Sequence, residues 1–253
     1  MFAQMGVDVD QDHHEITVHT MSPLNGRGPV FYASMPGANE TINGCKADGA
    51  GDKRLLLSAL LDHLVAMGSP LWKRGLSSNR SAFPIRVVRG LLGRPHLLCG
   101  EYRGPAISFS EGGGKVWAAL CGDESDIGID AAERDDFQRE YPFHRVFHPQ
   151  EHQHALRLAG GDLEKASALL WSVKEAVVKA LGCGFHLVDP LQITVHPEAE
   201  RAEGGEGWHT FPVDLSGKAW IWFPIVGCRS LWARSLPQKK MWLSIAVLRR
   251  QYL

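Results

Sequence analysis

Two short segments of the sequence carry charged side chains at spacings that suit chemistry. In the first, Asp130 is the one carboxylate in the otherwise hydrophobic run 127–131. In the second, Glu175 and Lys179 are four residues apart, so a helix would project both from one face, one turn apart. An exposed ion pair, worth roughly 0.5 kcal/mol or less, is the commoner meaning of that spacing. Spacing alone leaves both a surface ion pair and a functional pair open.

Basic residues become frequent before the tripeptide Gly93-Arg94-Pro95. They are Lys73, Arg74, Arg80, Arg86, Arg89 and Arg94. A solvated surface is the commoner meaning of such a run, and a local polyphosphate site is the alternative. Residues 111–114 read Glu-Gly-Gly-Gly between two expected strands. Because glycine permits positive φ and a close approach of backbone to a ligand, this hairpin is a second, weaker indication of ligand contact.

A third group is a crowd of histidines, namely His144, His148, His152 and His154. Spacings of four could place the first three on one helical face as a zinc site. Pro149 interrupts that helix, and no His-Glu-x-x-His order is present. We therefore expect a solvated segment here rather than a metal centre.

The elements that must position these residues follow from hydrophobic periodicity. Helical spacing predicts one helix over residues 53–66 and a stronger one over 167–181, which Gly182-Cys183-Gly184 ends. Short runs predict strands at 15–18, 106–109, 115–120, 127–131, 193–195, 219–223 and 241–247.

Two similar halves are indicated by a weak internal repeat. Gly6-Val7-Asp8 precedes the first helix, and Gly128-Ile129-Asp130 precedes the second. We predict an α/β (α+β) fold of two pseudo-symmetric lobes, residues 1–122 and 123–253, with a ligand cleft between them. Each lobe is expected to be a small, mainly antiparallel sheet packed with a helix.

Composition limits the classes of function. The 253 residues include 27 basic and 28 acidic side chains, so a bulk basic surface for nucleic acid is absent and any anion site must be local. The five cysteines form no CxxC pair and are expected to be reduced thiols. Acidic residues interrupt the first 15 positions, and no run of 18 apolar residues exists. These features favour a cytoplasmic protein.

Taken in order, the motifs resemble those of the surfactin-type 4′-phosphopantetheinyl transferases. That family pairs a G-(I/V)-D strand with a (W/F)-x-x-K-E-(S/A)-x-x-K helix. Here the strand ends at Asp130, and the helix motif begins about 45 residues later, running from Trp171 to Lys179. Gly93-Arg94-Pro95 resembles the family's G-K-P turn, Ser108-Phe109-Ser110 its N-x-S segment, and Gln150-Glu151 its intervening acid. The similarity covers roughly residues 85–190, and five weak motifs in one order are fairly specific.

The resemblance implies an enzyme that moves the 4′-phosphopantetheine group of coenzyme A to a serine hydroxyl of an apo carrier protein, with Mg²⁺, releasing 3′,5′-ADP. It implies Asp130 and Glu175 as metal ligands, because carboxylates suit Mg²⁺ on a pyrophosphate. Lys179 matches the family's pyrophosphate-contacting lysine, and Lys174, the first lysine of the motif, is expected to be a further contact to coenzyme A. The carrier could belong to fatty-acid, polyketide or peptide synthesis.

Further roles follow from the same resemblance. Glu151 resembles the residue proposed to help deprotonate the acceptor serine. Arg94 and Ser110 resemble contacts to the adenosine-side phosphates, and an arginine could fork two oxygens there. Arg54 is the best match for the family's N-terminal basic residues.

Two features depart from the family pattern. Ala132 stands where a third acid is usual, and Glu133 could replace it only if the strand end bulges. Glu111 stands where the family carries histidine beside the 3′-phosphate, and it would repel that phosphate unless Arg80, Arg86 or Arg89 paired with it. These departures leave a rival open: a degenerate member that binds coenzyme A or a carrier protein without turnover. A two-lobed chain of this kind is expected to be a monomer.

Overall fold

The computed structural model describes residues 15–22, 29–37, 49–67, 85–100, 102–122, 125–138, 141–197, 207–223 and 231–249. The first half forms a six-stranded antiparallel sheet with the strand order β1-β2-β6-β5-β4-β3. Its elements are β1 (Thr17–Met21), β2 (Val30–Pro36), α1 (Gly49–Ala66), β3 (Ile85–Arg89), β4 (Pro95–Cys99), β5 (Tyr102–Gly112) and β6 (Lys115–Cys121).

The second half forms a five-stranded antiparallel sheet with the order β7-β11-β10-β9-β8. Its strands are β7 (Ser125–Glu133), β8 (Ile193–Val195), β9 (His209–Leu215), β10 (Leu231–Pro237) and β11 (Met241–Arg249). Its helices are α3 (Phe143–Val146), α4 (Pro149–Leu158), α5 (Leu163–Leu181) and α6 (Gly217–Trp222), with short 3₁₀ turns η2 (Arg134–Phe137) and η3 (Pro190–Gln192).

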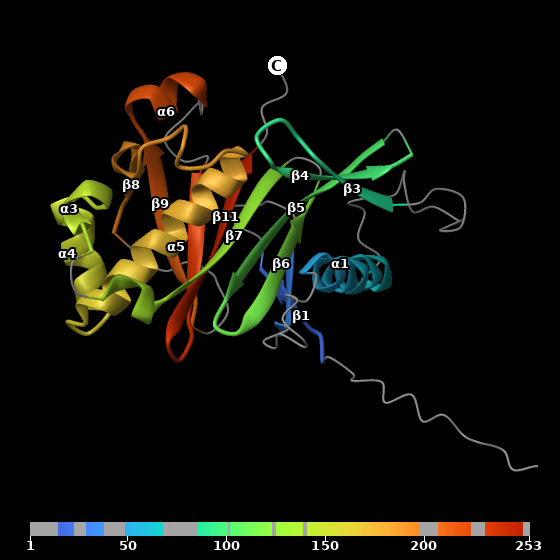
Figure 1. The fold of residues 1–253 in the computed structure, drawn as a ribbon, viewed down its shortest axis with the longest axis horizontal. Helices are drawn as coiled ribbons and strands as arrows, with labels where there is room; N and C mark the ends of the chain where they lie inside the picture. The colour runs from blue at the N-terminus through green and yellow to red at the C-terminus, as the bar shows by residue number, and fades with distance from the viewer. Residues whose placement is uncertain are drawn as a thin grey trace, which may run out of the picture.

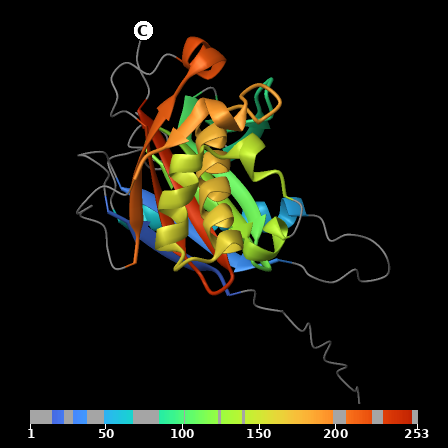
Figure 2. The ribbon, with the colours of Figure 1, turned by 90° about the vertical axis from the view of Figure 1, so that its left-hand side faces the viewer.

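The helices and sheets are layered. Helix α1 lies on the first sheet, α5 crosses the second sheet, and α4 runs beside α5 (Figures 1 and 2). One hydrophobic cluster lies under α1, a second lies under α5, and a third joins residues of both sheets. The expected α+β fold with two antiparallel sheets is therefore confirmed.

Strand alternation decides which side chains reach the helices. In β7, Ile127, Ile129 and Ala131 enter the cluster between the sheets. Because successive side chains of a strand point to opposite faces, Gly128 and Asp130 face α5 instead. The apolar run that surrounds Asp130 in the sequence thus serves the core, while Asp130 itself is turned to the helix.

One predicted element is wrong. Residues 219–223 were expected as a strand, but Gly217–Trp222 forms helix α6, with the amide of Phe223 donating to the carbonyl of Ala219. Ala219 is buried, whereas Trp220 and Ile221 are exposed. A short apolar run cannot be assigned to helix or strand by periodicity alone, and here local hydrogen bonding decided.

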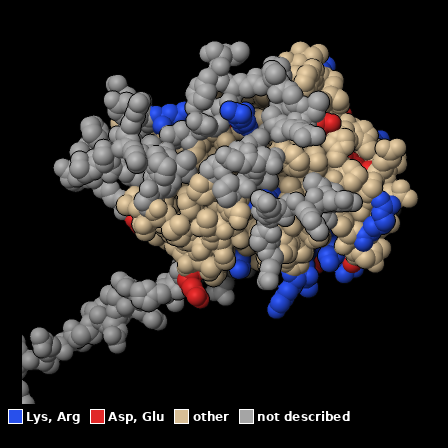
Figure 3. Space-filling model, turned by 180° about the vertical axis from the view of Figure 1, so that it is seen from behind, with Lys and Arg blue, Asp and Glu red and all other residues tan. Residues whose placement is uncertain are grey.

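The change from one sheet to the other falls between β6 and β7, on either side of residue 122. We propose this position as the boundary between the lobes 1–122 and 123–253. Gly6-Val7-Asp8, which suggested a repeat, lies outside the described residues. Seen from behind, the Lys and Arg side chains of the described residues lie at several separate places (Figure 3), in keeping with a net charge of −1. No described helix is long and apolar enough to cross a membrane.

Candidate active site

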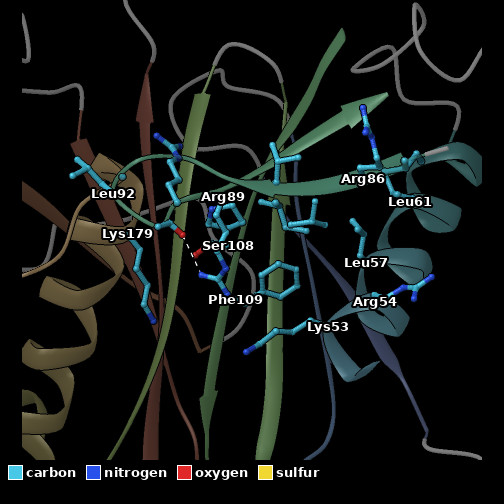
Figure 4. A pocket seen from close by; sticks show the side chains of 18 of the residues that line it. Lys53, Arg54, Leu57, Leu61, Arg86, Arg89, Leu92, Ser108, Phe109 and Lys179 are labelled. Atoms are coloured by element: carbon cyan, nitrogen blue, oxygen red, sulfur yellow. Dashed lines mark hydrogen bonds between the residues drawn. The ribbon is translucent and has the colours of Figure 1, made fainter. Parts of the chain in front are cut away.

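A basic pocket of about 1430 Å³ is formed where the two halves meet. Its wall includes α1, the hairpin β3–β4 and strand β5 on one side, and the end of α5 on the other (Figure 4). Six of its lining residues are basic: Lys53, Arg54, Arg86, Arg89, Arg94 and Lys179. Glu111 is the one acidic side chain among the lining residues. Such a wall suits a ligand that carries several negative charges.

A smaller pocket of about 380 Å³ shares Lys53, Phe109, Glu111 and Lys179 with the basic pocket. Its other lining residues include the carboxylates Asp130, Asp136 and Glu175, and the indole of Trp171. A basic and an acidic pocket therefore adjoin, and Lys179 belongs to both. A ligand could place phosphates in the first and its reacting end in the second.

Asp130 and Lys179 are in direct contact. Lys179 Nζ lies 2.7 Å from Asp130 Oδ1 and also donates to the carbonyl oxygen of Ile129 at 3.1 Å. Ser110 Oγ donates to the same Oδ1 at 2.9 Å, and it lies 3.3 Å from Lys179 Nζ. An ion pair thus links β7 to α5 at the pocket, on the face of β7 to which strand alternation directs Asp130.

The serines of β5 hold β7 in place. Strand β7 is an edge of its sheet, so amides on its outer side have no strand partner. Ser108 Oγ accepts from the amide of Ile129 at 3.1 Å, and Ser110 Oγ accepts from the amide of Ala131 at 3.3 Å. Side chains thus replace a strand ladder between the two sheets and fix the position of the acid on β7.

Close approach explains two glycines. A Cβ at Gly112 would lie 2.6 Å from the carbonyl oxygen of Ala131, so only glycine lets β5 end beside β7. A Cβ at Gly128 would lie 1.9 Å from the carbonyl oxygen of Ala176. Only glycine therefore lets α5 lie this close to β7, and that contact brings Glu175 and Lys179 to the level of Asp130.

Helix α5 is well defined at both ends. Asp162 accepts a hydrogen bond from the amide of Lys165 at the first turn. Gly182 ends the helix with φ of 80°, in the left-handed conformation that glycine adopts most readily. With the ends fixed, the four-residue spacing of Trp171, Glu175 and Lys179 brings all three to the smaller pocket.

Glu175 is half-buried and has a perturbed acidity. Burial raises the pKa of its carboxyl above the ordinary value of 4.5, the negative charge of Asp130 raises it further, and Lys179 acts in the opposite direction. Burial, and to a smaller extent the negative charge of Glu175, raises the pKa of Tyr141 to about 12. Ionisation of Glu175 is costly because the group is partly buried and lies near a second carboxylate. A bound cation would favour the ionised form, because it would offset the charge of both carboxylates.

The structure places Lys174 and Glu151 away from these pockets. Lys174 Nζ is paired with Glu151 Oε1, and the two side chains are 0% and 1% exposed. The lysine also donates to the carbonyl oxygens of Val146 and Pro190, at 2.8 and 3.0 Å. Lys174 was expected to contact coenzyme A, and burial rules out that contact in this conformation.

Glu151 requires a similar correction. Its Oε1 also accepts from the amide of His148 at 2.8 Å, and its Oε2 accepts from the amide of Val195 at 2.9 Å. Both oxygens are therefore occupied in a buried position, and the residue lines neither pocket. A carboxylate held in this way does not reach an incoming hydroxyl, so the expected role in deprotonation is not supported.

The predicted phosphate contacts are also refined. Arg94 lines the basic pocket, but its guanidinium is paired with Asp126 at the start of β7 and packs against Gly182. Arg54 is an exposed residue of the same pocket. Figure 4 shows Lys53 reaching toward the space between Phe109 and Lys179, whereas Arg54 points away from it.

Lys53 and Asp136 were not identified from the sequence. Lys53 Nζ lies 2.7 Å from Glu111 Oε1, so Lys53 is a partner of this acid. Of the three arginines considered for that pairing, Arg80 lies outside the described residues. Asp136 follows β7 in η2 and lines the smaller pocket, whereas Glu133 accepts from the amide of Gly113 at 2.7 Å. The sequence offered one signal for each residue. Lys53 is a basic residue at the start of the Leu-rich helix, and Asp136 is an acid three residues after the end of β7.

The histidines do not form a centre. His148 Nε2 contacts the carbonyl oxygen of Leu191 at 2.8 Å, and the ring of His152 stacks against both Phe143 and Phe147. Helix α4 begins at Pro149, so the segment is not one continuous helix. Within the described part of the chain, no group of three or more His, Cys, Asp or Glu side chains could by itself hold a metal ion.

A comparison with models of protein families finds a match that covers part of the chain. Residues 126–215 match the family model of the 4′-phosphopantetheinyl transferase superfamily, a span that runs from β7 to β9 and includes Asp130, Glu175 and Lys179. None of the curated proteins matches significantly. A solved structure described as "Chronobacterium ammoniagenes ACPS-CoA complex" is similar to the chain at 21% identity, covering 51% of this chain and 98% of that one. Its TM-score is 0.41, too low to support an argument.

Proposed function

We propose that this protein transfers the 4′-phosphopantetheine group of coenzyme A to a serine hydroxyl of an apo carrier protein, and releases 3′,5′-ADP. The observation that carries the proposal is the contact of Asp130 with Lys179, beside Glu175, where a polybasic pocket adjoins an acidic one. The match of residues 126–215 to the superfamily supports the same reaction.

We further propose the surfactin-type subfamily. Its motifs occur here in order from Gly93-Arg94-Pro95 to Lys179. The basic pocket takes its wall from α1 and the first sheet together with the end of α5, all within a single chain, so a ligand can be enclosed without a second copy. Both observations favour a monomeric, two-lobed enzyme.

The donor set fits a partly hydrated Mg²⁺. Asp130 and Glu175 line the same pocket, and among the described residues both contacts of Asp130 use Oδ1. Two carboxylates are few ligands, but Mg²⁺ usually keeps several waters and takes phosphate oxygens from its substrate. When bound, the ion would offset negative charge on the pyrophosphate. Asp130 and Glu175 would hold it.

The residues of the chain have separate tasks in the transfer. The basic side chains of the large pocket bind the phosphates, and Lys179 offsets charge that develops on the pyrophosphate oxygens. The serine oxygen forms a bond to the phosphorus next to pantetheine, and the bond from that phosphorus to the oxygen of 3′,5′-ADP breaks. The hydroxyl proton passes to solvent, because Glu151 is enclosed. Lys174 and Glu151 act by positioning α5.

A mass measurement tests the proposal directly. Apo carrier proteins of the fatty-acid, polyketide and peptide types are incubated with coenzyme A, Mg²⁺ and the protein, and each carrier is weighed by mass spectrometry. We expect a gain of one phosphopantetheine unit on at least one carrier, and no gain with the Asp130→Asn variant. Unchanged mass on every carrier, together with tight binding of coenzyme A, would instead indicate a binding protein.

A further inference from the structure

We propose that Ser172 and Ser244 are positioning residues of the transfer. Their hydroxyl groups fix where α5 lies along its sheet, and thereby how Glu175 stands relative to Asp130. Neither serine lines the basic or the acidic pocket, so both act through the helix rather than on a ligand. The inference rests on the proposed function for the reaction that is measured, whereas the position of the helix on its sheet is a property of the chain alone.

The first argument is a row of side chains across the second sheet. Asp130 of β7 lies opposite Ser244 of β11, and Ser244 lies opposite Ser235 of β10. Because directly opposite residues of antiparallel strands project from the same face, all three side chains face α5. The acid of the proposed metal site and the two serines therefore lie at one level of the sheet.

Hydrogen bonds join this row to the helix. Ser172 Oγ lies 2.7 Å from Ser244 Oγ, which lies 2.8 Å from Ser235 Oγ. Ser172 Oγ also donates to the carbonyl oxygen of Leu169 at 2.9 Å. Because a hydroxyl has a single hydrogen to donate, Ser244 must donate to Ser172, and Ser235 must donate to Ser244. The chain of hydroxyl groups therefore has one direction, from β10 through β11 to α5.

These hydrogen bonds are fully enclosed. Ser172, Ser235 and Ser244 are each 0% exposed. A buried hydroxyl that loses its partner cannot turn to water instead, so breaking the contact costs the desolvation of both groups. A movement of α5 that pulls Ser172 away from Ser244 is therefore opposed.

Apolar packing defines the position of this helix less sharply. Of the 19 residues of α5, 13 are buried, so hydrophobic contacts surround most of its circumference. After the first turn, the residues of α5 that are not buried are Trp171, Glu175 and Lys179, which all line the acidic pocket. Hydrophobic contact has no preferred direction, whereas a hydrogen bond requires a particular distance and angle. A displacement of α5 by one residue would move Ser172 about 1.5 Å along the axis and about 100° around it, and would break its contact with the sheet.

The helix carries this constraint to the site. Ser172 and Glu175 are three residues apart, so they are neighbours on successive turns of α5. Ser244 and Asp130 are opposite each other on adjacent strands. The hydrogen bond between the two serines therefore relates the helix that bears one carboxylate of the site to the strand that bears the other.

Steady-state kinetics of transfer to a carrier protein test the role of the pair. Ser172→Ala and Ser244→Ala should each lower kcat about fivefold, because each removes one buried hydrogen bond that orients α5. KM for coenzyme A should change by less than about twofold, because the basic pocket keeps its lining residues. The double variant should lose no more than either single variant, since all three lack the same hydrogen bond.

Two other serines provide matched controls. Ser167 of α5 is also 0% exposed, but it donates to the carbonyl oxygen of Leu163 within the helix and contacts His152 of α4. Ser167→Ala should therefore leave kcat unchanged. Ser235→Ala keeps the bond between Ser172 and Ser244, so its kcat should fall between that of wild type and that of Ser244→Ala.

A merely structural role would lower the urea midpoint of Ser172→Ala and Ser244→Ala and leave kcat at the wild-type level, and that result overturns the proposal. Losses that multiply in the double variant overturn it too, because the two serines would then act independently. Should the double variant fail to fold, kcat of the single variants decides.

Amide hydrogen exchange of the protein alone separates this proposal from the proposed function. If wild type transfers to no carrier, exchange in residues 171–181 is compared by mass spectrometry. We expect exchange there to be at least about fivefold faster in the Ser172→Ala/Ser244→Ala variant than in wild type, and unchanged in Ser167→Ala. That result would refute the proposed function and keep the role of the serines in holding α5, whereas equal exchange would refute both.

Discussion

Lys174 and Glu175 are neighbours in the sequence but belong to opposite environments. Lys174 is fully buried and paired with Glu151, whereas Glu175 lines the acidic pocket. Because adjacent helical residues diverge by about 100°, one turn of α5 places one charge in the core and one at the site. The buried Lys174 therefore fixes the orientation of α5 about its own axis, and this orientation directs Glu175 into the acidic pocket.

The first prediction concerns this anchor. Lys174→Met should lower the free energy of unfolding by about 3–5 kcal/mol, because it leaves Glu151 as a buried charge without its cation. Urea denaturation at neutral pH measures the loss. The double variant Lys174→Met/Glu151→Gln should be more stable than Lys174→Met alone. Lys218→Met, at an exposed lysine, is the control, and an equally small effect at Lys174 would contradict a structural role.

The second prediction concerns the two proposed metal ligands. Asp130→Asn and Glu175→Gln should each reduce transfer to a carrier protein at least about 100-fold, since each removes a charge that would hold Mg²⁺. Circular dichroism should remain that of wild type. Asp135→Asn serves as the control, because Asp135 is exposed and lines neither pocket. Near-normal turnover of either variant at saturating Mg²⁺ would remove that residue from the metal site.

The third prediction separates two roles of Lys179. If it stabilises charge that develops during transfer, Lys179→Ala should lower kcat by about 100-fold with a smaller effect on KM for coenzyme A. Steady-state kinetics at several coenzyme A concentrations give both constants. A raised KM with unchanged kcat would show that Lys179 contributes to ground-state binding alone.

The fourth prediction is a pH dependence of stability that originates at Glu175. The pKa of this carboxyl is raised in the folded protein, so the folded state holds its proton more firmly than the unfolded state. The stability it contributes is complete below its ordinary pKa of 4.5 and is lost as pH rises through the folded value. Glutamine stays neutral, so Glu175→Gln should avoid this loss.

Urea denaturation in EDTA, from about pH 4 to about pH 7, measures the difference between Glu175→Gln and wild type. That difference should move in favour of the variant as pH rises. Added Mg²⁺ should stabilise wild type at neutral pH and have less effect on the variant. A difference that stays constant over this pH range would contradict the cause assigned to the pKa shift.

The sequence by itself determined the local features. The period of α5, its glycine stop and the four-residue spacing of Glu175 and Lys179 were readable because helix geometry is set by neighbouring residues. The order of short motifs suggested the proposed chemistry. Side chains of a strand alternate between its two faces, so a single acid among apolar residues, as in β7, could be expected to face away from the core. The short run 219–223 was misassigned because it is too brief for either periodicity to decide.

Only the tertiary structure decided which charges meet. Glu151 and Lys174 looked like site residues, yet the packing of α4 and β8 around α5 encloses them. Lys53 and Glu111 are 58 residues apart, and their pairing depends on where α1 lies on the first sheet. Asp130 and Lys179 meet because Gly128 allows α5 close to β7. Such contacts are long-range, and no local propensity encodes the burial or the partner of a charged side chain.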